Sequence, residues 1–238
     1  MKRDEDIIAL FLVNEDYLKQ IKEKYSQSLM NKDIDPQLKV KIKNYLENLR
    51  SILDYLAKEI KEKYVLTQDK PYFPMACKNK DDFIKYANKQ FPNLISKNKL
   101  LFDTLESYQS YNPNGLKSLN KFNSLVNEKK HDNLTPQEIK EMGRSLSLQF
   151  PNGASIGLGL GSSISGNGII ESGGAKVILN NEPISGNSPA KNISGNVSQK
   201  VTIWKNIKFS SIDEDVLPFL ELVKSDVSYI ASDLKKYL

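Results

Sequence analysis

Glycine is distributed very unevenly along this chain of 238 residues. Ten of its 12 glycines lie between Gly153 and Gly195, in a stretch where serine and asparagine are frequent and charged residues are scarce. Glycine disfavours helix because its backbone loses more freedom on folding than that of other residues. This stretch is therefore not expected to continue a helical fold, and it marks an internal boundary in the chain.

The residues before this boundary have the spacing of amphipathic helices. Apolar residues return to one face over residues 5–30 and again from Pro36 to about Tyr64, where Asp35-Pro36 is typical of a helix start. Further helices are expected from near Asp81 to Pro92, from Leu94 to Tyr108, from Leu116 to about residue 127, and, after a capping-box pattern at Thr135-Pro136-Gln137-Glu138, to about Met142.

Strand signals replace helical spacing within the glycine-rich stretch. Ile156, Leu158 and Leu160 alternate with glycines, which is the two-residue period of a strand. Other strand candidates are Ile169-Ile170, residues 175–179 and residues 201–209, and Gly173-Gly174 is typical of a hairpin turn. A small antiparallel sheet is predicted.

Helical spacing returns from Asp213 to Leu238. We therefore predict a mainly α fold, in which a helical bundle carries a small glycine-rich antiparallel β insertion before the C-terminal helix. The expected divisions are a bundle over residues 1–145, a β segment over 146–210 and a helix over 211–238. The last helix should dock on the bundle, because a lone amphipathic helix has to bury its apolar stripe.

The charge of the chain permits RNA as a partner without requiring it. The net charge is +5, but only Arg3, Arg50 and Arg144 of the 34 basic residues are arginine, the residue preferred for bidentate phosphate contacts. No run approaches the roughly 20 apolar residues of a membrane span. The charged N-terminus does not have the pattern of a secretory signal, so a cytoplasmic location is expected.

No cofactor is predicted. One cysteine and one histidine exclude an intrachain disulfide, a cysteine-based zinc site and a multi-histidine metal site, and Cys77 is interpreted as structural. After Gly157-Leu158-Gly159 the third glycine of a dinucleotide-binding loop is replaced by Ser162, and no P-loop lysine follows. A magnesium ion held by Asp or Glu residues that folding brings together stays open.

His131 is the candidate for proton transfer, because histidine is the side chain that ordinarily titrates near neutral pH. Asn127 lies four residues earlier, on the same helical face, where it could orient the imidazole. Lys129 and Lys130 would supply positive charge for a phosphate. The alternative is that His131 only caps a helix end, where the helix dipole favours a cation.

Two segments carry a family resemblance. Residues 49–57, with Arg50 and Asp54 on a long helix, and residues 119–131, which end in Asn127-Glu128-Lys129-Lys130-His131, resemble the HEPN superfamily of helical bundles over roughly residues 1–135. The resemblance implies a metal-independent ribonuclease, toxin or phage-defence effector, or a non-catalytic nucleic-acid or protein-binding module. It also implies a homodimer.

The catalytic signature of that family has an arginine before the polar residue and the histidine. Here Asn127 and His131 match, but Val126 occupies the arginine position, which predicts weakened or absent cleavage because valine donates no hydrogen bond. Arg50 could approach this site if the two helices are neighbours, and Asp54 could support His131. The leading hypothesis is RNA binding or cleavage with His131 and Asn127 as catalytic residues and Lys129, Lys130 and Arg50 as substrate contacts. The alternative is a non-catalytic module whose β segment binds a protein partner.

Overall fold

The computed structural model describes residues 1–64, 70–128 and 136–238. The chain divides into two compact units: unit 1 consists of Met1–Glu138 and Ile207–Leu238, and unit 2 of Ile139–Asn206. The structure is about 50% helical and 22% strand and contains a curled four-stranded antiparallel sheet. The expected mainly α fold with a small β insertion is therefore wrong, and the chain is an α/β protein.

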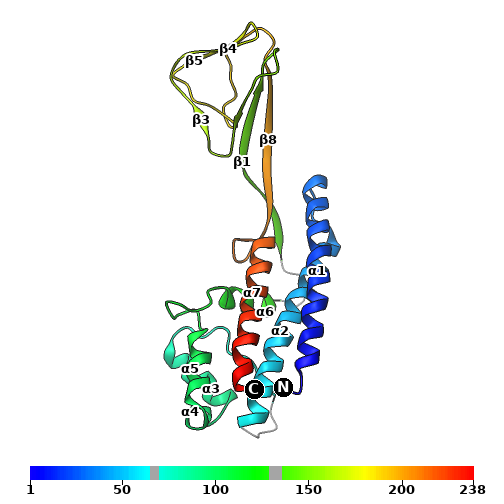
Figure 1. The fold of residues 1–238 in the computed structure, drawn as a ribbon, viewed down its shortest axis with the longest axis vertical. Helices are drawn as coiled ribbons and strands as arrows, with labels where there is room; N and C mark the ends of the chain where they lie inside the picture. The colour runs from blue at the N-terminus through cyan, green and yellow to red at the C-terminus, as the bar shows by residue number, and fades with distance from the viewer. Residues whose placement is uncertain (65–69, 129–135) are drawn as a thin grey trace. The chain divides into compact units, whose positions relative to one another are not determined.

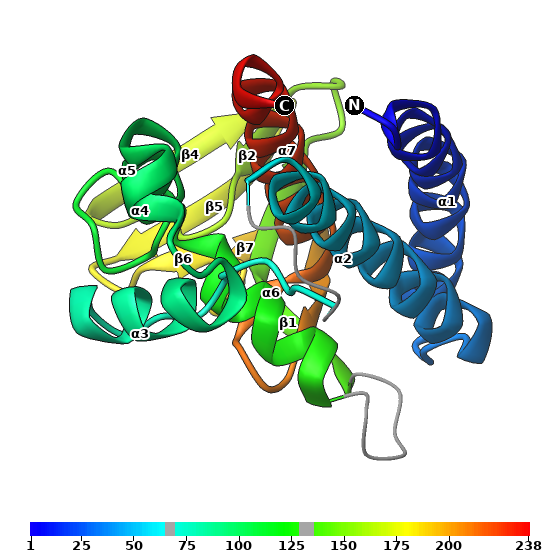
Figure 2. The same cartoon turned by 90° about the horizontal axis from the view of Figure 1, so that it is seen from below.

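Unit 1 is built around the long helix α2 (Pro36–Tyr64). Its start agrees with the sequence signal, because the Asp35 side chain accepts a hydrogen bond from the Gln37 backbone N–H at 2.8 Å. α2 lies between α1 (Asp4–Asn31) and α7 (Val216–Leu234), as Figures 1 and 2 show. A short 3-10 turn, η2 (Lys235–Tyr237), follows α7. The apolar residues of α2, which the sequence places on one helical face, are buried along the length of the helix. Their removal from water stabilises the fold.

Buried polar groups join α2 to both of its neighbours. The fully buried Asn14 donates from Nδ2 to the Tyr45 carbonyl at 3.1 Å and accepts from Asn48 Nδ2 at 3.0 Å. On the other side, the Tyr45 hydroxyl donates to the Leu220 carbonyl of α7 at 3.1 Å. Burial raises the pKa of Tyr45, so this hydroxyl keeps its proton. These bonds satisfy groups that would be costly to bury unpaired.

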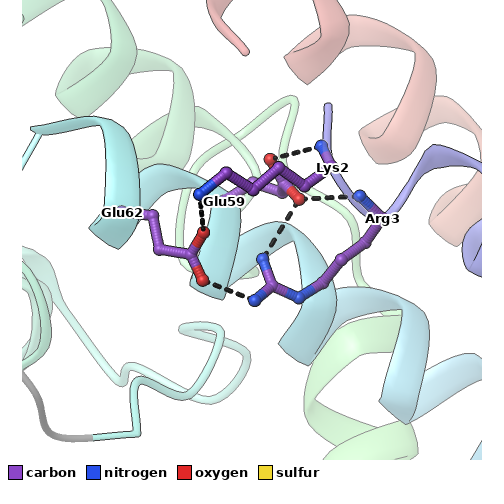
Figure 3. A network of polar contacts seen from close by, with 4 residues as sticks. All are labelled: Lys2, Arg3, Glu59 and Glu62. Carbon is purple, nitrogen blue, oxygen red and sulfur yellow. Dashed lines mark hydrogen bonds and ion pairs between the residues drawn. The ribbon is translucent and has the colours of Figure 1, made fainter.

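A network of four residues ties the start of α1 to the last turns of α2 (Figure 3). Glu59 accepts hydrogen bonds from the backbone N–H of Lys2 at 3.1 Å and of Arg3 at 2.9 Å, and from Arg3 Nη1 at 3.1 Å. Arg3 Nη2 also donates to Glu62, and Lys2 Nζ lies 3.3 Å from Glu62 Oε2. The hydrogen bond from Arg3 lowers the pKa of Glu62.

Four shorter helices complete this part of unit 1: α3 (Lys80–Gln90), α4 (Leu94–Lys97), α5 (Lys99–Ser107) and α6 (Ser118–Glu128). The single helix expected from Leu94 to Tyr108 is in fact two. Asn98 interrupts it with a φ of −153°, and its side chain caps α5 by accepting a hydrogen bond from the Leu101 N–H at 3.0 Å. α6 packs against both α2 and α7.

The longest strand, β1 (Gln137–Gln149), occupies the place of the short helix expected up to Met142. That prediction is wrong for the described residues; Thr135, at its start, lies outside them. β1 pairs with β2 (Ser155–Leu158) and with β8 (Ser198–Phe209), in a sheet of order β2-β1-β8-β9, where β9 is Glu214–Asp215. β2 pairs only with Leu146–Gln149, so near Gln137 the extended backbone depends on pairing with β8, which overrides the local capping pattern.

Unit 2 has a core of its own. The residues of this core come from β1, from shorter strands and from loops: Leu146, Leu148, Phe150, Leu158, Ala175, Val177, Ile184 and Ala190. The remaining strands form a two-stranded sheet, β3 (Ser163–Ile164) with β6 (Ile184–Ser185), and a three-stranded sheet of order β4-β5-β7, made of Asn167–Ser172, Ala175–Asn180 and Ile193–Ser194. The predicted hairpin turn at Gly173-Gly174 is confirmed, with φ of 56° and 75°.

Within the described ranges, every helix is either too short or too polar to span a lipid bilayer.

Candidate functional site

A polar pocket of about 280 Å³ opens in unit 1, and we call it the Arg50 pocket. Four parts of the chain form it: α2, the segment of residues 70–79, α3 and α6. The lining residues are Arg50 of α2, Tyr72, Phe73, Met75, Ala76 and Cys77 of the segment, Tyr86 of α3, and Asn123 and Asn127 of α6.

Arg50 is the centre of the polar contacts in this pocket. Its Nε donates to Asp54 Oδ2 at 3.2 Å, and its Nη1 donates to Asn123 Oδ1 at 3.3 Å. Nη1 also lies 3.5 Å from the Met75 sulfur, a weak acceptor. The guanidinium carbon lies 5.9 Å from the centre of the Tyr72 ring, within the range of a cation–π contact. Nη2 has no acceptor among residues 1–64, 70–128 and 136–238, and within these ranges that edge of the fork is open to a ligand.

Asp54 positions both the arginine and the segment opposite it. One carboxylate oxygen accepts a hydrogen bond from Arg50 Nε, and the other accepts one from the backbone N–H of Phe73 at 3.3 Å. The side chains of Arg50 and Asp54 are only 18% and 23% exposed, so this ion pair is more than a solvated surface contact. Asp54 therefore fixes which edge of the guanidinium faces the pocket.

The 70–79 segment is held at further points. The backbone N–H of Tyr72 donates to Gln90 Oε1 at 3.0 Å, and the buried Gln109 donates from Nε2 to the Pro74 carbonyl at 3.0 Å. Tyr72 as a whole residue is 47% exposed. The segment thus presents an open aromatic ring on an anchored backbone.

Two titratable groups in the pocket wall are neutral at neutral pH. Burial raises the pKa of Tyr86, although the nearby Arg50 opposes this shift. Burial, and to a lesser extent the charge of Asp82, raises the pKa of Cys77 to about 11. A thiol that keeps its proton is a poor nucleophile, which agrees with the interpretation of Cys77 as structural.

The structure brings together three of the residues proposed from the sequence. Arg50 and Asn127 line the same pocket, with Asp54 behind Arg50. α2 and α6 are neighbours, as the approach of Arg50 required. Val126, at the family's arginine position, is buried and does not line the pocket. The other three proposed residues, Lys129, Lys130 and His131, lie outside the described residues. The support of His131 by Asp54 therefore stays a prediction.

Sequence reasoning missed three polar residues of the site, Tyr72, Tyr86 and Asn123, and the aromatic Phe73. A signal existed for Asn123, because it lies four residues before Asn127 and shares its helical face. Tyr72 and Tyr86 come from a proline-bounded segment and a separate helix, and only tertiary contacts place them here. Among the residues that the structure describes, no three His, Cys, Asp or Glu side chains are grouped as metal ligands would be.

The apolar side chains of unit 2 differ in exposure. Leu158 is buried in the core of unit 2, whereas Leu160 and Trp204 are about half exposed. Other large apolar side chains of unit 2 are exposed as well: Met142, Ile169, Ile178, Val201 and Ile203.

No protein-family model, curated protein or solved structure matches the chain. The resemblance to the HEPN superfamily therefore remains a hypothesis that rests on the residues themselves.

Proposed function

We propose that the protein binds RNA at the Arg50 pocket and, together with His131, cleaves it without a metal ion. The observation that carries the proposal is the position of Arg50, which α2 delivers to the Asn123 and Asn127 face of α6. Arg50, an arginine from another helix, would then donate the hydrogen bonds to phosphate that Val126 cannot donate. A guanidinium suits this role because its planar donors match phosphate oxygens.

The chemistry proposed is attack of an RNA 2′-hydroxyl on the adjacent phosphorus. The bond to the 5′-oxygen of the next nucleotide breaks, leaving a 2′,3′-cyclic phosphate and a 5′-hydroxyl. An imidazole takes the 2′-hydroxyl proton, and an imidazolium returns a proton to the leaving oxygen. Since the chain has one histidine, a homodimer would supply the second. Arg50 would stabilise the charge that develops on the phosphate.

Binding and cleavage are tested separately. Fluorescence anisotropy at fixed salt measures the affinity for labelled single-stranded RNA, because phosphate contacts depend strongly on salt. Arg50→Gln is expected to weaken binding about tenfold, the loss of one charge-assisted hydrogen bond. The control is Arg144→Gln, which removes an exposed arginine of unit 2 that pairs with Glu141; it should change the affinity by less than about twofold.

Cleavage of single-stranded and transfer RNA is followed in EDTA. His131→Ala should abolish cleavage and leave binding intact, and Asn127→Ala should slow it. Circular dichroism checks that the variants remain folded. Equal RNA binding by the wild type, Arg50→Gln and Arg144→Gln would reject the Arg50 pocket as the RNA site, and cleavage that survives His131→Ala would reject the proposed chemistry.

The exposed apolar side chains of unit 2, among them Trp204 and Ile169, favour a second candidate: a non-catalytic module that binds a protein partner through unit 2. Absence of RNA binding by the wild type would favour this candidate. A cytoplasmic location belongs to the leading proposal, as does a role in phage defence or a toxin-type system. That role follows from the resemblance alone.

A further inference from the structure

The Arg50 pocket is larger than a bare phosphate needs. Its volume of about 280 Å³ corresponds to roughly nine water molecules at liquid density. It also approaches the lower end, about 300 Å³, of the volumes that small organic ligands occupy. A phosphate on Arg50 would therefore leave room for a further group beside it.

Tyr72 offers that further group an aromatic surface. Arg50 approaches the ring at 5.9 Å from its centre, yet 47% of the residue stays exposed. The hydrogen bonds of the Tyr72 N–H to Gln90 and of the Phe73 N–H to Asp54 fix the backbone on which the ring stands. A ring held in this way can stack on a nucleic-acid base at little ordering cost, whatever the base.

The remaining polar groups suit the sugar and the edge of a base. Asn123 uses its Oδ1 for Arg50, and its amide N–H groups have no acceptor in the described part of the chain, so they suit a ligand. The exposed Asn127 lies one turn further along α6. Side-chain amides both donate and accept, as base edges and ribose hydroxyls require. Of the described lining residues, Arg50 alone is a cation, which favours a single phosphate over a polyphosphate.

We infer that the Arg50 pocket holds one nucleotide unit, with its base against the Tyr72 ring and its phosphate at the Nη2 edge of the Arg50 guanidinium. The inference rests on the proposed function and deepens it, since it names the part of the RNA that this pocket takes. Free AMP should then occupy the pocket.

NMR titration of the full chain with AMP, adenosine and inorganic phosphate tests the inference. AMP should bind with upfield shifts of its base protons, as ring stacking produces, and more tightly than adenosine or phosphate. Tyr72→Leu should weaken AMP binding about tenfold and leave phosphate binding unchanged. Two controls should retain AMP binding within about twofold: Tyr72→Phe, which keeps the ring, and Trp204→Leu, which removes a comparably exposed ring of unit 2.

The outcomes separate this inference from the proposed function. Equal affinity for AMP and phosphate, or AMP binding that Tyr72→Leu does not change, would overturn the nucleotide unit; RNA binding that still depends on Arg50 would then leave the proposed function standing. Tyr72-dependent AMP binding without RNA binding would support the nucleotide site and reject RNA as the ligand. The base-proton shifts of the wild type do not depend on any variant, so their absence would overturn the inference even if Tyr72→Leu failed to fold.

Discussion

Glu59 and Glu62 lie three residues apart on α2 and both bind Arg3, but their side chains are 8% and 40% exposed. Glu59→Ala should lower the free energy of unfolding by about 1–2 kcal/mol, because two backbone N–H groups and the guanidinium lose a buried acceptor. Glu62→Ala should cost less than about 0.5 kcal/mol, as exposed ion pairs do. Urea unfolding followed by circular dichroism measures both.

Glu59→Gln is the matched control for this comparison. It keeps a side-chain oxygen that can accept one of the backbone N–H groups, so it should recover part of the loss seen in Glu59→Ala. Equal destabilisation by Glu59→Ala and Glu62→Ala would show that burial does not decide the strength of this network.

Only some of the residues that form the pocket could be predicted from the sequence. Arg50, Asp54 and Asn127 stood out because a helix and a family resemblance drew attention to them. The contact between Arg50 and Asn123 joins residues 73 positions apart, and the place of Tyr72 depends on hydrogen bonds to α2 and α3. Local spacing holds no information on such contacts, so the open aromatic ring of the pocket could not be foreseen.

At the scale of elements, long amphipathic patterns were predictable and short local signals were not. α2 has a cap and a continuous apolar stripe, and its bounds were expected closely. Over Gln137–Met142 a capping pattern indicated helix, but these residues belong to a strand that pairs with β8. The neighbours of a strand lie far away in sequence, and the energy of their pairing exceeds the few tenths of a kcal/mol that separate helix propensities.

The contact between α6 and α7 gives a pH-dependent prediction. Ser118 of α6 donates to the half-buried Asp226 of α7, but burial dominates and raises the pKa of Asp226. A carboxyl whose pKa is raised on folding binds its proton more tightly in the folded state. Its charge therefore costs stability as pH rises above the ordinary value of 3.8.

Asp226→Asn should accordingly raise the melting temperature at pH 7 by a few degrees and lose this advantage near pH 3, where Asp226 is itself protonated. Thermal melts of both proteins between pH 3 and pH 7 measure the difference. Asp233→Asn is the contrasting variant. Burial alone would raise the pKa of Asp233, but the hydrogen bonds from Lys236 and Tyr108 and the charge of Lys236 together lower it, so this variant should be destabilised at pH 7. A gain for Asp226→Asn that did not change with pH would exclude the charge of Asp226 as its cause.

For the whole molecule, unit 2 is an insertion whose two ends return to the same place in unit 1. Unit 1 resumes at Ile207 after leaving at Glu138, and the Ser210 N–H donates to the Pro136 carbonyl at 3.1 Å. Each unit also has its own buried core. A chain in which a short Asn-Gly turn replaces residues 139–206 should therefore fold, because the turn closes an existing antiparallel pair.

This shortened chain should keep a helical circular dichroism spectrum and a cooperative thermal transition. A version that also carries Tyr45→Phe, which removes the hydrogen bond from α2 to α7, should melt at a lower temperature, reporting that α7 is still docked. A broad transition without this difference would mean that unit 1 depends on unit 2 for its fold.

Because α7 packs on α2, the apolar face of α2 is not fully covered until α7 has been synthesised. Tyr45 and Leu220, which bond across this contact, are separated by 175 residues, so at about 5–20 residues per second α7 emerges roughly 10–35 s after the α2 face that it covers. During this interval the nascent chain exposes an apolar stripe that chaperones recognise. Synthesis that stalls within unit 2 would leave that stripe exposed for as long as the stall lasts.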